Sequence, residues 1–189
     1  MMALLAKLIR RLAYEILRVT AGTSAAAQYL GVRVGRDCRI ITRDLGSEPW
    51  MIRVGDRVTI ANNVSILTHD GSTGLIRDSK GRRFRYARVE IGDDVFIGVQ
   101  CVILPGVRIG TRVIVAAGSI VTSSVPDGVI VAGNPARVIG KFSDYERRIL
   151  QTCHASEDMV GANYRERVLS IAENGFRSEL TQVVDRARK

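Results

Sequence analysis

Aliphatic residues recur at every sixth position over much of this chain, and this period restricts the fold more than any other feature. The unbroken run is Ile91, Ile97, Ile103, Ile109, Val115 and Val121, preceded by Val54, Ile60 and Ile66 and by the pair Val34 and Ile40. An α-helix needs a period near 3.6 and an ordinary strand a period of 2, so six fits neither. It predicts short strands joined by corners, with three sides to each coil and the aliphatic side chains stacked inside.

Small residues follow the same period. Glycine often comes directly after the aliphatic residue, as in Ile91-Gly92 and Ile97-Gly98, and a small or β-branched residue such as Val95 or Cys101 comes four positions after it. We expect the glycine to ease the corner, because it lacks the Cβ that restricts backbone conformation. Only 5% of the residues are aromatic, which fits a core of stacked, branched side chains.

The repeat divides the chain into three parts. We predict an N-terminal amphipathic helix and connector over residues 1–30, a mainly β repeat domain over 31–141, and a C-terminal helical extension over 142–189 with helices near 143–156 and 163–187. A long polar insertion, residues 68–90, and a shorter break over 43–51 interrupt the repeat. Long insertions in a rigid scaffold are usually functional.

The N-terminal segment over residues 2–20 has a single apolar stripe at helical spacing. The stripe consists of Leu5, Leu8, Leu12, Ile16 and Val19. We expect it to pack against the body of the protein or a neighbouring subunit; the alternative is a basic helix on an anionic membrane. Charged residues such as Lys7 and Arg10 interrupt the segment, so it resembles neither a signal peptide nor a membrane span.

Charge and cysteine content narrow the classes of partner and compartment. The net charge of +9 favours anionic partners, but no motif typical of a nucleic-acid-binding protein is present. The three cysteines, Cys38, Cys101 and Cys153, are widely spaced and odd in number. They predict reduced thiols and a cytoplasmic protein, and we assign them no nucleophilic role.

His69 is the strongest candidate for a catalytic group. It is one of two histidines, and it lies in Ile66-Leu67-Thr68-His69-Asp70-Gly71, where a coil gives way to the polar insertion. An imidazole can accept a proton near neutral pH, as a general base must. Its other ring nitrogen needs a partner to orient it, and Asp70, Asp93, Asp94, Glu48 or a backbone carbonyl are candidates.

These residues resemble the hexapeptide-repeat acyltransferases, and especially the sugar O-acetyltransferases. The likeness extends over roughly residues 30–141 and is carried by the segment Ile60–His69 and by segments between Phe96 and Lys141, such as Leu104-Pro105-Gly106-Val107 and Gly133-Asn134-Pro135-Ala136. It implies a left-handed parallel β-helix, a homotrimer, acetyl-CoA as co-substrate and no metal. The implied reaction is direct acetyl transfer to a hydroxyl of a saccharide or cell-surface polysaccharide precursor, with His69 as general base.

The resemblance also implies roles for particular residues. It places acetyl-CoA along Gly98, Ala117, Gly118, Thr122, Ser123, Arg137 and Lys141. Ser123 stands where the family usually has a lysine, and Arg137 and Lys141 are the candidate replacements for that charge. Asp70 is a second catalytic candidate, which could instead hold the loop or touch substrate. Asn63, Arg83 and Tyr86 are candidates for acceptor binding, and the arginine-rich part of the loop is either a solvated lid or a contact for CoA phosphates or an acidic or diphosphate-linked saccharide.

Other functions of this fold remain as alternatives. An amino-sugar N-acetyltransferase would keep the same donor and base, and a non-catalytic scaffold or membrane-binding protein would need neither. A carbonic anhydrase of this fold needs three histidines for its zinc, and a serine acetyltransferase resembling this family has a second active-site histidine. The chain has two histidines in all, and His154 belongs to the C-terminal helical segment rather than to the repeat, so we set both aside.

Overall fold

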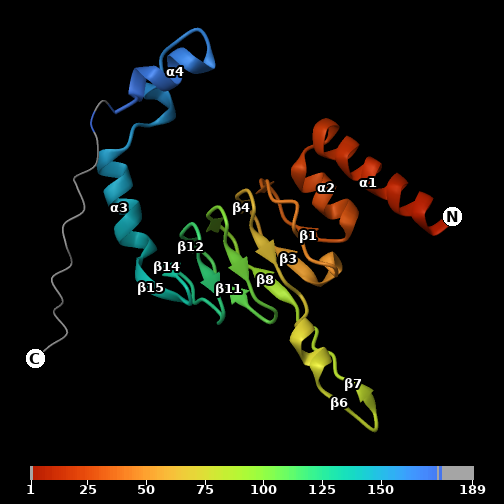
Figure 1. Cartoon of the computed structure of the whole chain (residues 1–189). Helices are drawn as coiled ribbons and strands as arrows, with labels where there is room; N and C mark the ends of the chain where they lie inside the picture. The colour runs from red at the N-terminus through yellow and green to blue at the C-terminus, as the bar shows by residue number, and fades with distance from the viewer. Residues whose placement is uncertain (1, 174, 176–189) are drawn as a thin grey trace, which may run out of the picture. The chain divides into compact units, whose positions relative to one another are not determined.

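The computed structural model describes residues 2–173 and 175. The chain divides into two compact units, the first ending at Glu146 and the second beginning at Arg147, and each is treated by itself. The first unit contains the repeat domain (Figure 1).

The repeat forms three parallel sheets. One contains β1 (Arg33–Val34), β3 (Ile52–Val54), β8 (Val89–Ile91) and β11 (Arg108–Ile109). A second contains β2 (Arg39–Ile40), β4 (Thr59–Ile60), β9 (Phe96–Ile97), β12 (Ile114–Val115), β14 (Val129–Gly133) and, at its edge, β15 (Ala136–Lys141). The third contains β5 (Ser65–Ile66), β10 (Val102–Ile103) and β13 (Ile120–Val121).

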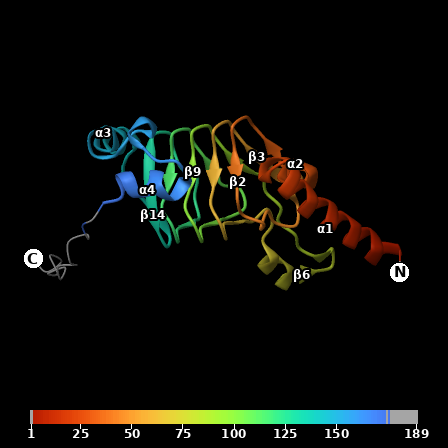
Figure 2. The ribbon, with the colours of Figure 1, turned by 90° about the horizontal axis from the view of Figure 1, so that it is seen from above.

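The chain visits the three sheets in turn, so equivalent residues of successive coils stack. Ile91 pairs with Ile109, and Ile103 pairs with Val121, in each case three six-residue repeats later. Figure 2 shows the coils side by side in a row. The repeated aliphatic side chains are buried in one hydrophobic cluster. The period of six therefore corresponds to three mainly parallel sheets that the chain visits in turn.

The glycines of the repeat have a different role from the one we expected. Gly92 and Gly98 do not have positive φ angles; the corner falls two residues later, at Asp94 (φ 55°) and Gln100 (φ 60°). A Cβ on Gly98 would lie 2.6 Å from the backbone nitrogen of Ala117 in the next coil. Glycine is thus needed because stacked coils approach closely, and the expectation that it eases the corner was wrong.

Both predicted breaks in the repeat are present. The first contains the short 3-10 helix η1 (Pro49–Met51). The long insertion contains η2 (Gly71–Leu75) and a hairpin of β6 (Arg77–Asp78) and β7 (Gly81–Arg82), which projects from the coil (Figure 1).

Two helices precede the coil, α1 (Met2–Thr20) and α2 (Thr23–Leu30). Tyr14 of α1 is buried, while α1 itself extends beyond the strands (Figures 1 and 2). The predicted stripe residues Leu5, Leu8, Leu12, Ile16 and Val19 are each more than half exposed. The expectation that this stripe packs against the body of the same chain was therefore wrong. No described helix is both long and apolar enough to cross a bilayer.

After the coil, β14 and β15 form an antiparallel hairpin that the period of six did not predict. It is followed by α3 (Phe142–Thr152), the 3-10 helix η3 (Ser156–Asp158) and α4 (Tyr164–Ile171). Asn163 begins α4 by accepting a hydrogen bond from the backbone of Glu166, as a helix N-cap does. The second predicted helix, over 163–187, lies partly outside the described residues. Within them, the observed helix α4 ends at Ile171.

Candidate active site

The backbone holds His69 at the root of the long insertion. His69 forms an antiparallel bridge with Tyr86, Asp70 donates from its backbone N–H to the carbonyl of Arg85 (3.0 Å), and Ala87 donates to that of Thr68 (2.8 Å). The two ends of the insertion are thus tied together where they leave the coil. This pairing fixes the position of the imidazole relative to β5.

Glu48, from the first break in the repeat, orients the imidazole. Its Oε2 lies 3.0 Å from His69 Nδ1 and accepts a 2.6 Å hydrogen bond from the Thr68 hydroxyl. The hydrogen bond from Thr68 and then that from His69 lower the pKa of Glu48 below its usual 4.5, against the opposing effect of burial. An ionised Glu48 accepts a hydrogen bond from Nδ1–H and so selects the tautomer that keeps a lone pair on Nε2.

A pocket of about 200 Å³ lies beside His69. It is lined by His69, Asp70, Gly71, Thr73, Arg82, Phe84, Arg85 and Tyr86. The Tyr86 ring lies 5.8 Å from the imidazole and stacks on Phe84 with 6.3 Å between centroids, while the Arg82 guanidinium lies 5.1 Å from the Phe84 ring centre. The imidazole of His69 therefore faces a cavity with aromatic and cationic walls, a setting suited to a polar ligand.

The other candidates for orienting His69 have different partners. Asp70 accepts from the backbone N–H and the hydroxyl of Ser72 (3.0 and 2.6 Å), at the start of η2. Asp93 accepts from the backbone of Asp56 (2.8 Å), and Asp94 is paired with Arg57 (2.6 Å). Asp70 lines the pocket and holds the loop, so the geometry favours Glu48 as the orienting group.

The three acceptor candidates are not brought together. Tyr86 lines the pocket. Arg83 is paired with Asp78 of the hairpin. Asn63 occupies a corner with a φ of 56°, the left-handed conformation that also occurs at Asp94. The left-handed corner by itself explains an asparagine at position 63. Of the three candidates, only Tyr86 lies beside His69.

The donor candidates on the coil do gather. Gly98 packs on Ala117, because its Cα approaches the Ala117 backbone too closely for a side chain, and Gly118 donates to the carbonyl of Val99 (2.8 Å). Gly133 donates from its backbone to the Ser119 hydroxyl (3.2 Å). These contacts place the small residues of successive coils, and the turn after β14, along one strip of the surface.

The charged and hydroxyl candidates are more dispersed. Arg137 pairs across the hairpin with Ala132, next to Gly133, whereas Lys141 pairs with Val129. Their separation of four positions corresponds to about 13 Å of extended strand. Lys141 instead lines a separate hollow with Thr111 and Asp127. Thr122 and Ser123 are exposed just after β13. Of the two candidate replacements for the missing lysine, only Arg137 adjoins the small-residue strip.

Several residues of the site were not singled out from the sequence. Thr73, Arg82 and Arg85 line the cavity, and Thr68, which is fully buried, donates to Glu48 beside it. The burial of Thr68 could not be predicted by aligning the repeats, because Thr68 follows the last strand of a coil.

Cys101 is buried, and desolvation raises the pKa of its thiol. Within residues 2–173 and 175, no group of three His, Cys, Asp or Glu side chains could hold a metal ion.

Comparison with known proteins places this arrangement in a family. The model of the bacterial transferase hexapeptide family (six repeats) matches residues 88–123. Protein CapG of Staphylococcus aureus is 44% identical over 141 residues, 73% of this chain and 80% of CapG. Galactoside O-acetyltransferase of Escherichia coli is 35% identical over 100 residues, and this chain spans about half of its length (53% of this chain and 49% of the relative).

A solved structure agrees with these sequence matches. It is a hexapeptide-repeat acetyltransferase from Vibrio cholerae in complex with acetyl-CoA, 25% identical, with a TM-score of 0.52 over 70% of this chain and 85% of the other. The period of six, the three parallel sheets and the extended likeness to CapG agree with one another. The chain belongs to the hexapeptide-repeat acyltransferase family.

Proposed function

We propose that this protein is an acetyl-CoA-dependent O-acetyltransferase that acetylates a saccharide hydroxyl, with His69 as general base. The observation that carries the proposal is the 3.0 Å contact between His69 Nδ1 and Glu48 Oε2 beside a pocket. It leaves Nε2 available, because within the described part of the chain no other hydrogen-bond partner of the imidazole is present.

The reaction follows from this geometry. Nε2 of His69 removes the proton of the acceptor hydroxyl as its oxygen forms a bond to the thioester carbonyl carbon. The C–S bond then breaks, and the imidazolium returns the proton to the departing thiolate. Glu48 stabilises the imidazolium while it exists, a role that a carboxylate fulfils for other catalytic histidines. General-base help of this kind accelerates such reactions by about 10²–10⁴-fold.

Acetyl-CoA would supply the activated acetyl group. The strip of small residues at Gly98, Ala117 and Gly118 suits its pantetheine arm, because close approach of a flexible chain needs small side chains. Arg137 is the candidate for a phosphate contact. The acetyl-CoA complex of the V. cholerae relative supports this donor.

We further propose a left-handed coil and a homotrimer, as the family resemblance implies, with donor bound between neighbouring subunits. Analytical ultracentrifugation tests the assembly: three copies are expected, and a fully active monomer would refute it.

The exposed apolar stripe of α1 lies on a helix that also carries Arg10 and Arg11. This combination supports peripheral contact of α1 with an anionic membrane surface.

An acceptor screen tests the proposed activity. Release of CoA from acetyl-CoA is measured with a panel of hydroxyl and amino sugars, with products identified by mass spectrometry. Sugar-dependent release with an ester product is expected. An amide product from amino sugars alone would favour the N-acetyltransferase, and neither CoA binding nor release with any acceptor would favour a non-catalytic scaffold.

A further inference from the structure

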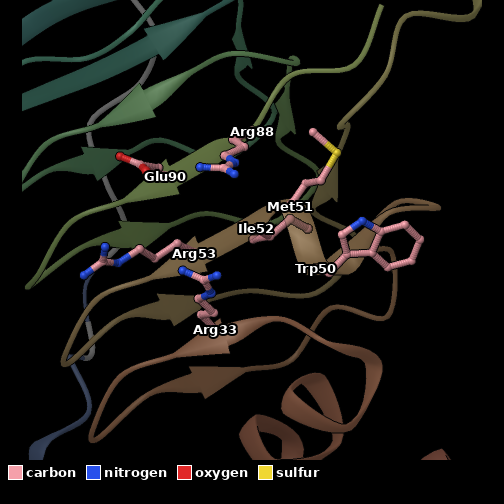
Figure 3. A pocket seen from close by; sticks show the side chains of 7 residues that line it. All are labelled: Arg33, Trp50, Met51, Ile52, Arg53, Arg88 and Glu90. Atoms are coloured by element: carbon pink, nitrogen blue, oxygen red, sulfur yellow. The ribbon is translucent and has the colours of Figure 1, made fainter.

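A second pocket, of about 110 Å³, lies on the outer side of the sheet that contains β1, β3 and β8. It is lined by Arg33, Trp50, Met51, Ile52, Arg53, Arg88 and Glu90 (Figure 3). Three of these side chains are guanidinium groups and one is a carboxylate, so the lining is cationic. Its volume suits a single small group better than a whole saccharide.

Arginines outnumber the one carboxylate of this pocket. Glu90 is the register neighbour of Arg53 on one side and of Arg108 on the other. Arg33 and Arg53 are direct neighbours in the register of β1 and β3, and adjacent strands lie only about 4.8 Å apart. Like charges directly opposite each other destabilise a sheet. Within the described residues neither arginine, nor Arg88, forms an ion pair with an acidic side chain. Guanidinium groups arranged in this way match the oxygen atoms of a phosphate or carboxylate.

An exposed aromatic ring borders the cationic group. Trp50 is 61% exposed, and Figure 3 shows it on one side of the arginines, with Glu90 next to Arg88. A flat, exposed ring offers an apolar face to a sugar while the arginines take a charge. Glu90 can accept a hydrogen bond from a hydroxyl group.

Two short segments connect this pocket to the base. Glu48 contacts His69, and Trp50 follows it by two residues. Tyr86 forms the backbone bridge with His69, and Arg88 follows it by two residues and lines the second pocket. The stretch with Tyr86 and Arg88 thus contributes a side chain to each pocket, and the stretch with Glu48 and Trp50 leads from the contact with His69 to the second pocket.

We propose that Arg33, Arg53 and Arg88, beside Trp50, bind an anionic group of the acceptor, so that the acceptor is a saccharide carrying a phosphate or a carboxylate. This inference rests on the proposed function in one respect: the bound saccharide is an acceptor only if the protein transfers acetyl groups. The binding itself does not depend on acetyl transfer.

Trp50 is the only tryptophan of the chain, so its fluorescence reports directly on this pocket. The full-length protein is titrated with glucose 1-phosphate, glucuronate, neutral glucose and coenzyme A at constant ionic strength, since salt screens exposed charges. We expect saturable changes with at least one anionic sugar, at concentrations at least 10-fold below any response to glucose. Equal responses to charged and neutral sugars, or a response to coenzyme A alone, would overturn the proposal.

The double variant Arg33→Gln/Arg53→Gln should weaken anionic-sugar binding by about 10-fold to 100-fold, as expected for losing hydrogen bonds to a charged group. The control Arg108→Gln removes one arginine charge from the same sheet, in register with Glu90 but outside the pocket, and should leave binding unchanged. A double variant that binds like the wild type, or that alters only the oligomeric state, would contradict the proposal and assign this surface to contact between copies.

The two proposals can fail separately. If the titration behaves as expected but no sugar is acetylated, the anion pocket stands and the transferase activity does not. If neutral sugars are acetylated and the anionic sugars do not bind better than glucose, the activity stands and the anion pocket does not.

Discussion

Glu48 and His69 lie 21 positions apart in the chain, yet Glu48 Oε2 is 3.0 Å from His69 Nδ1. One belongs to the first break in the repeat and the other to the root of the second. Stacking of successive coils brings the two breaks to the same side of the scaffold. Each break alone would supply one residue of the pair, and the coil between them sets the distance.

Replacing His69 by alanine should lower kcat by about 10²–10⁴-fold, because the acceptor hydroxyl would then lose its general base. Coenzyme A binding should persist, since His69 is not part of the strip around Gly98. Steady-state kinetics and calorimetric titration measure the two effects. His154→Ala, which changes the histidine outside the insertion, is the matched control, and an equal loss in both variants would argue against a catalytic role for His69.

Replacing Glu48 by glutamine should lower kcat by about 10-fold to 100-fold, because a charge-assisted hydrogen bond to the imidazole is lost while the shape of the side chain is kept. Asp70→Asn should change kcat less than 3-fold by the same reasoning, since its carboxylate accepts from Ser72 rather than from His69; that small limit is roughly 0.6 kcal/mol. Turnover at saturating acetyl-CoA measures both. The reverse order of the two effects would make Asp70 the orienting group.

The same carboxylate predicts a dependence of stability on pH. The pKa of Glu48 in the folded protein is below its usual 4.5, chiefly because of the Thr68 hydrogen bond. A lowered folded-state pKa stabilises the fold above the unfolded-state pKa, and this stabilisation is lost as pH falls through the folded-state value. The stability advantage of wild type over Glu48→Gln should therefore be constant near pH 7 and shrink below about pH 4.5. Chemical unfolding at several pH values measures it; a difference independent of pH would contradict the assignment.

Close stacking of coils predicts that Gly98→Ala is destabilising. The added Cβ would lie 2.6 Å from the Ala117 backbone nitrogen, and such overpacking costs about 1–3 kcal/mol. Gly140→Ala is the control, because a Cβ there meets no atom within 4 Å. Thermal unfolding compares them. If Gly98→Ala unfolds like the wild type, close approach is not the reason for this glycine.

The exposed stripe of α1 predicts membrane contact that depends on apolar side chains. Leu8→Glu/Leu12→Glu should abolish flotation with vesicles containing anionic lipid, because charged side chains would replace two apolar contacts on the stripe. Leu150→Glu, at an exposed position of α3, should float like the wild type. No flotation of the wild type, together with loss of the oligomer in the double variant, would assign the stripe to a subunit contact.

The sequence by itself determined the coil, because one aliphatic side chain per six residues can be buried only if each six residues form one side of a stacked turn. It also located both breaks and the histidine at the root of the longer one, since an interruption of so regular a period is visible without coordinates. The roles of the repeat glycines and of Asp70 could not be predicted from the sequence. Close approach between coils and the hydrogen bonds of a turn depend on atoms of other segments.

Only the tertiary structure decided which of five candidate groups contacts His69, which of the residues expected to bind the donor lie together, and that Arg33, Arg53 and Arg88 line one pocket with Trp50. Such choices depend on distances between segments from different coils, and those distances are set by how coils stack and how loops leave them. The period records which side chains point inward. It does not record which outward side chains meet, because solvent-facing positions are free of the packing constraint that produces the period.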